Sequence, residues 1–127
     1  LEWNFQRTLA KVNYRIHTEA IKDNLMPKEL TKRQINFVYA SEADMLNMAL
    51  FGKTAKEWRD ENPNAKGNIR DYAVIEQLVV LSNLESINSV LIRQGSAQSK
   101  RLMQLNKIAI TQMKSLAGNK NIRRLKK

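Results

Sequence analysis

The chain of 127 residues carries a net charge of +10, and 43% of its residues are apolar and 27% charged, a composition that allows one domain with a hydrophobic core. The absence of cysteine excludes disulfides, thiolate metal sites and cysteine nucleophiles. With only 4 Gly and 2 Pro the chain lacks the turn residues that a domain of many short strands requires, so we expect an all-α fold.

An amphipathic helix is predicted over residues 1–24. Its apolar residues recur at three- and four-residue spacing, and they are Phe5, Leu9, Val12, Ile16 and Ala20. This stripe covers about two heptads, fewer than the three or four that indicate a coiled coil. We therefore expect this face to pack onto the domain. Pro27 ends the helix, because the residue before a proline is disfavoured in the helical region.

Two helices are predicted before the clearest loop of the chain. Thr31 with Gln34, and Thr54 with Glu57, are capping-box patterns that mark helix starts. The first of these helices continues to Gly52, a residue typical of a left-handed helix end. The second is short and runs to about residue 61. Residues 62–67, rich in Asn, Pro and Gly, then form a loop.

The longest apolar stretch, residues 68–93, predicts a central helix. We expect Asn68 to cap it and Asp71 to favour its first turn, where a negative charge stabilises the helix dipole. Its first half, through about Leu81, is apolar in nearly all directions, which predicts that other helices surround it. Its second half narrows to one apolar stripe, which docking of the last helix explains.

The last predicted helix follows Gly95, with Ser96 as its cap, and runs to about residue 116. Lys100, Lys107 and Lys114 recur every seven residues and therefore form one exposed basic line. From residue 100 onward the chain holds nine of its 22 Lys and Arg residues and no acid. Such a positive field attracts polyanions. The alternative is a solvated helix face followed by a tail that aids solubility.

These elements predict one helical domain over residues 1–117, followed by a basic tail at 118–127. The expected fold is a compact bundle of about five helices around the central apolar helix. No apolar run reaches the length of a membrane span, and no signal-peptide pattern opens the chain. We therefore expect a cytoplasmic protein without membrane contact.

Basic residues before the central helix, on the last helix and in the tail are the candidate nucleic-acid contacts. They are Lys66, Arg70, Lys100, Arg101, Lys107, Lys114, Lys120, Arg123, Arg124, Lys126 and Lys127. Trp58 is the candidate for stacking on a base, with a place in the core as the alternative. Free amides near Asn68 would make that helix end a candidate anion site.

No motif predicts catalysis or a cofactor. Gly52-Lys53-Thr54 is similar to the end of a phosphate-binding loop, but Asn47 occupies the position of the required first glycine. His17 is the only histidine and has no cysteine or second histidine with which to share a metal. We therefore expect a protein that is not an enzyme, without cofactor, metal or small-molecule substrate.

Four carboxylates support the one enzymatic alternative, a metal-dependent enzyme that acts on nucleic acid. They are Glu42, Asp44, Glu57 and Asp60. The first two diverge on a helix because residues two apart do not share a face. Lysine and arginine residues alternate with the other two, which indicates ordinary surface ion pairs.

Four segments of the chain together resemble one known family. They are NYRIHTEAIKDNL, INFVYASEADMLNMALFGKTAKEWRDENPNAKGNIRDYA, QLVVLSNLESIN and QLNKIAITQMKSL. They are similar, in the same order, to the C-terminal region of bacterial KilA-N domain-containing proteins. The resemblance covers nearly the whole chain up to residue 116. It implies a DNA-binding protein associated with phages, prophages and mobile elements, with transcription regulation in some members.

In that family DNA binding belongs to the N-terminal KilA-N domain, so the resemblance assigns no DNA contact to this chain. The leading hypothesis is a non-enzymatic accessory module that self-associates or docks a protein partner, with an auxiliary DNA contact. Its first helix would continue from a DNA-binding domain. The alternative is a pure protein-interaction domain, for repressor capture or dimerisation, which apolar residues left exposed after packing would distinguish.

Overall fold

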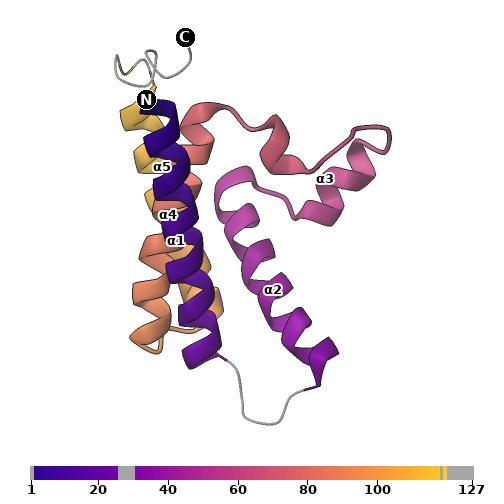
Figure 1. Ribbon diagram of the computed structural model, residues 1–127, viewed down its shortest axis with the longest axis vertical. Helices are drawn as coiled ribbons and strands as arrows, with labels where there is room; N and C mark the ends of the chain where they lie inside the picture. The colour runs from indigo at the N-terminus through magenta and orange to yellow at the C-terminus, as the bar shows by residue number, and fades with distance from the viewer. Residues whose placement is uncertain (1, 26–30, 118, 120–127) are drawn as a thin grey trace.

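A computed structural model describes residues 2–25, 31–117 and 119, and shows five α-helices and one short 3-10 helix there (Figure 1). They are α1 (Glu2–Asn24), α2 (Lys32–Phe51), α3 (Ala55–Glu61), the 3-10 helix η1 (Ile69–Tyr72), α4 (Ile75–Arg93) and α5 (Gln98–Leu116). The described residues contain no strand, which confirms the predicted all-α bundle of about five helices. The predicted tail at 118–127 lies outside them except for Asn119.

The helix α4 lies at the centre of the bundle, as predicted. It packs against α1, α2 and α5, and α2 also packs against α5. α3 contacts η1 and projects to the side, away from α1, α4 and α5 (Figure 1). None of the helices in residues 2–25 and 31–117 combines the length and apolarity that crossing a membrane requires.

The main hydrophobic core lies between α2, α4 and α5. Its buried members are Met45, Leu46, Ala49, Val80, Leu81, Leu84, Leu105 and Ala109. A second, smaller cluster of Ala20, Ile21 and Ile92 joins α1 to α4. Since each fully buried large apolar side chain contributes about 1.5–3 kcal/mol, most apolar stabilisation comes from the first cluster.

The predicted starts of α2 and α3 are confirmed. The hydroxyls of Thr31 and Thr54 accept hydrogen bonds from the amides of Gln34 and Glu57, whose side chains bond back to the capping residues. Gly52 closes α2 with φ of 75°, in the left-handed region that glycine adopts without strain. The predicted cap of α5 is displaced by one residue, because Ala97 and not Ser96 precedes the first turn.

The predicted single helix over residues 68–93 is wrong, because two elements occupy this stretch. Asn68 caps η1, and the chain is extended at Ala73 and Val74 before α4 begins at Ile75. The amide of Arg70 donates to Asn68 Oδ1 over 2.9 Å, and the amide of Asn68 donates to Asp71 Oδ2 over 2.7 Å. Both amides are therefore already bonded, and the predicted anion site at this helix end has no structural basis.

The predicted packing face of the first helix is also wrong. Phe5, Leu9, Val12 and Ile16 are 66%, 42%, 49% and 39% exposed, whereas Ala20 is buried as expected. Polar contacts set the orientation of α1 on α4. Asn13 donates to Ser82 Oγ over 2.8 Å, and His17 contacts Asn88. The polar side of the second half of α4 is consequently buried beneath α1 and is not left to solvent.

Candidate functional site

Three predicted basic contacts form an exposed line on α5. Lys100, Lys107 and Lys114 are all exposed, as the seven-residue spacing predicted. Lys66, in the loop before η1, is exposed, and Arg70, in η1, is half-buried, so these two predicted contacts belong to other elements than the α5 line. The remaining predicted contacts, Lys120, Arg123, Arg124, Lys126 and Lys127, lie outside the described residues.

Arg101 does not belong to the basic surface, which corrects its prediction as a nucleic-acid contact. Its side chain is only 2% exposed and forms an ion pair with Glu42. Its Nε donates to the carbonyl of Ser96 over 2.9 Å, and its Nη1 donates to Asn88 Oδ1 over 3.0 Å. With these partners inside the bundle, the guanidinium cannot reach a phosphate in solution.

Trp58 lies neither in the core nor free on the surface. Its half-buried ring is 5.3 Å from the ring of Tyr72, and the Arg59 guanidinium lies 5.0 Å from its centroid. Arg59 also donates to the carbonyls of Ala65 and Gly67 and so closes the loop at 62–67. These contacts give Trp58 a role in joining α3 to η1.

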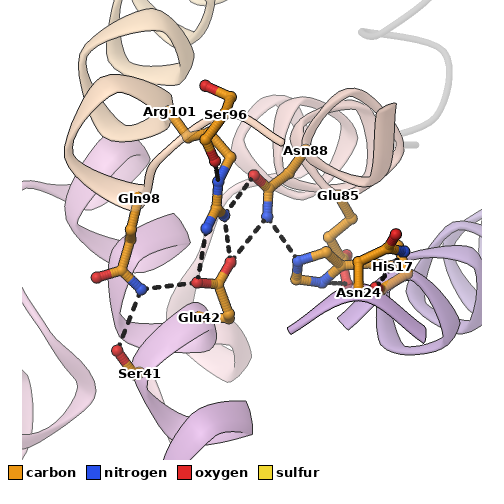
Figure 2. Close-up of polar contacts among 10 residues, drawn as sticks. His17, Asn24, Ser41, Glu42, Glu85, Asn88, Ser96, Gln98 and Arg101 are labelled. Carbon is orange, nitrogen blue, oxygen red and sulfur yellow. Dashed lines mark hydrogen bonds and ion pairs between the residues drawn. The ribbon is translucent and has the colours of Figure 1, made fainter. Parts of the chain in front are cut away.

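A buried polar cluster joins α1, α2, α4 and α5 (Figure 2), and it is the feature that sequence analysis missed. Each helix supplies one main member: His17, Glu42, Asn88 and Arg101. Both oxygens of Glu42 accept from the Arg101 guanidinium, one of them over 3.1 Å. Such a two-pronged contact fits the planar guanidinium and is stronger than a bond between neutral groups.

Asn88 continues the cluster from Arg101 to α1. Its Nδ2 donates to Glu42 over 3.3 Å and lies 2.8 Å from His17 Nε2. Because an amide nitrogen only donates, Nε2 accepts, and the neutral imidazole carries its proton on Nδ1. That Nδ1 lies 4.0 Å from Glu85 Oε2.

The pKa values of Glu42 and His17 in the cluster and of the neighbouring Glu85 are all shifted from their usual values. Burial raises the pKa of Glu42, but hydrogen bonds from Arg101 and Gln98 outweigh it, so the pKa lies below its usual value. Burial lowers the pKa of His17 to about 4; Glu42 opposes this, and Arg101 adds to it. Burial raises the pKa of Glu85 to about 7, against the opposing charge of Arg70.

Two cavities have Glu85 in their lining. The larger, about 670 Å³, lies between α1, η1 and α4, and we call it the η1 cavity. The smaller, about 240 Å³, lies between α1, α2 and α4. Arg70, Glu85 and Tyr14 line both. Glu85 Oε2 is buried and has no hydrogen-bond partner among the described residues.

The carboxylates of the enzymatic alternative do not converge. Glu42 is paired with Arg101, Glu57 bonds the amide of Thr54 over 3.1 Å, and Lys56 donates to Asp60 over 3.4 Å. In the described part of the chain, no three His, Asp or Glu side chains lie together as metal ligands.

The exposed apolar residues of α1 make a different candidate site. Phe5, Leu9, Val12 and Ile16, here called the α1 stripe, occupy a helix face other than the one that carries buried His17. Sequence analysis found this stripe but assigned it to the core. The buried polar cluster had a weaker signal: Arg101 is four residues from buried Leu105, on the same helix face.

Comparisons with known proteins found no match to this chain among protein-family models, curated proteins or solved structures.

Proposed function

We propose that the chain is a non-enzymatic helical module through which a DNA-binding, phage-related regulator of the KilA-N type self-associates. The observation that carries the proposal is the α1 stripe, which is 39% to 66% exposed on a domain that has a separate core. Contiguous apolar surface of this kind is typical of protein interfaces. The regulatory context rests on the resemblance of the four sequence segments.

A second copy of the chain is the occupant that fits the stripe best. The stripe has the 4-3-4 spacing of the apolar positions of a coiled coil. In an antiparallel pair, Phe5 lies across from the partner's Ile16, and Leu9 lies across from the partner's Val12. The four side chains of one copy then cover the same four of the other, as a two-fold interface requires.

The test replaces the centre of the stripe and measures mass by sedimentation equilibrium. We expect the wild-type chain to be a dimer and Leu9→Ser with Val12→Ser to raise the dissociation constant at least about tenfold, because apolar burial is lost in both copies. Met103→Ser with Ile110→Ser is the matched control, since these α5 side chains are 65% and 50% exposed. A monomeric wild type at millimolar concentration, or an equal loss in the control, would contradict the proposal.

The basic line on α5 favours an auxiliary DNA contact as a second function. Lys100, Lys107 and Lys114 are exposed on one face and recur every two turns. Three phosphate contacts would change the slope of log K against log salt by about 3, since each contributes about 0.9. Nucleic-acid binding and dimerisation then respond oppositely to salt, because salt screens the repulsion between two copies of charge +10.

Replacement of the three lysines by Gln is therefore expected to weaken duplex binding and to flatten its salt dependence. Fluorescence anisotropy at several salt concentrations measures both quantities. Lys56→Gln is the control, because Lys56 already pairs with Asp60 at 3.4 Å. An unchanged slope in the triple variant would remove DNA contact from the functions of this surface.

A further inference from the structure

The η1 cavity has the size and lining of a small-molecule site. Its volume of about 670 Å³ falls within the range of about 300–1,000 Å³ that ligand pockets occupy. Five apolar side chains contribute to its wall: Ala10, Ala73, Ile75, Leu78 and Leu81. A wall of this kind excludes water from the apolar body of a ligand, and a few polar groups then fix its orientation.

The first orienting group is Glu85, which is 3% exposed. Its Oε2 has no hydrogen-bond partner in the part of the chain described. The neutral His17 ring on α1 does not satisfy it, because the Nδ1 donor is 4.0 Å away, beyond hydrogen-bond distance. A buried acceptor without a donor is costly, so a ligand that supplies a donor gains the energy that the fold leaves unrealised.

The second orienting feature is a set of cationic side chains that line the cavity. Arg70 from η1 and Lys11 from α1 face the cavity together with Arg7, whereas Asp71 is the one acid there besides Glu85. Arg70 is half-buried, and a guanidinium in that setting binds a carboxylate more strongly than one in full solvent. The cavity thus offers an apolar wall, a buried acceptor and a cationic lining.

We propose that the η1 cavity binds a small organic anion with an apolar body, whose carboxylate pairs with Arg70 and Lys11 and whose hydroxyl donates to Glu85. An aromatic ring between the two polar groups fits the apolar wall and keeps the ligand carboxylate away from Glu85. The proposal is independent of self-association, because Phe5, Leu9, Val12 and Ile16 do not line this cavity.

The experiment titrates the full chain with 4-hydroxyphenylacetate and, separately, with phenylacetate, which lacks the hydroxyl. It is carried out at pH 8, above the pKa of about 7 for Glu85, so that the carboxylate is an acceptor. Amide signals of residues 70–85 are expected to shift in nuclear magnetic resonance spectra, and phenylacetate is expected to bind at least about tenfold more weakly. Unpaired polar groups reject such an analogue by that factor or more.

Three variants separate the parts of the site. Leu78→Trp fills the cavity and is expected to abolish binding of both probes, and Arg70→Gln weakens both about tenfold or more. Glu85→Leu removes the acceptor and is expected to equalise the two affinities. Met103→Ser on α5 is the control and leaves both affinities unchanged. Circular dichroism confirms that each variant is folded.

Three results would overturn the proposal. The first is no shift in residues 70–85 with either probe at 20-fold the protein concentration. The second is unchanged binding in folded Leu78→Trp. The third is a wild type that binds both probes equally, or shifts confined to the α1 stripe, which would place the probes on the proposed dimer face.

Discussion

Glu85→Gln is expected to stabilise the protein at pH 8 by roughly 3 kcal/mol and to leave its stability at pH 4 nearly unchanged. The pKa of Glu85 is raised from its usual 4.5 to about 7 in the folded chain. The folded state therefore keeps a proton that the unfolded state releases between these pH values. Stability falls as pH rises from 4.5 to 7, and the full penalty of a buried carboxylate is present above pH 7. Glutamine keeps the shape and never ionises.

The lowered pKa of His17 provides a second test of this prediction, in the pH dependence of stability. Its pKa is lowered from 6.5 to about 4, so its contribution to stability is present above pH 6.5 and is lost as pH falls to 4. Between pH 4.5 and 6.5 the contributions of His17 and Glu85 have opposite slopes and nearly cancel. The variant lacks the Glu85 contribution, so its stability should rise with pH across this interval.

Urea denaturation of both proteins at pH 4, 5.5 and 8 measures the difference directly. Glu19→Gln is the control: Glu19 pairs with Arg15 on the surface, and the two side chains are 54% and 81% exposed. Parallel profiles for wild type and Glu85→Gln would show that the carboxyl is not held in its buried position.

Arg101→Met is expected to destabilise the fold by about 3–5 kcal/mol, because it leaves Glu42 charged, buried and without its main partner. The two side chains are 2% and 3% exposed, so solvent cannot replace the lost guanidinium. Adding Glu42→Leu to Arg101→Met should recover part of the loss, since it removes the unpaired buried charge, whereas Asn88 Oδ1 remains without its donor. Chemical denaturation of both single variants and the double variant gives the coupling energy.

An exposed pair provides the control for this cycle. Arg93 and Asp23 lie 3.4 Å apart with side chains 50% and 56% exposed. Arg93→Met should cost less than about 1 kcal/mol. A similar small loss for Arg101→Met would mean that the buried pair does not hold α2 and α5 together.

Sequence alone predicts the helix starts that carry a recognisable capping pattern. The capping boxes at Thr31 and Thr54 lie within four residues of sequence, so both helix starts were correct. The break at Val74 also has a local cause, since Gln77 accepts from the Val74 amide over 2.9 Å. No glycine or proline marks it, and the apolar run conceals it.

The orientation of α1 could not be predicted in this way. It depends on Asn13 meeting Ser82 and on His17 meeting Asn88, pairs that are 69 and 71 residues apart. A stripe of large apolar residues is the stronger pattern in isolation, so Phe5 and Ile16 were assigned to the core. Because these residues are apolar and exposed instead of buried, they form the proposed dimer face.

The buried polar cluster also restricts how this sequence can change during evolution. His17, Glu42, Asn88 and Arg101 come from four different helices and satisfy one another. A replacement at one of these positions leaves at least one of the others without its partner. Viable lineages would therefore be expected to change these positions together, whereas an exposed α5 residue outside the basic line, such as Met103, can change without leaving a buried partner unsatisfied.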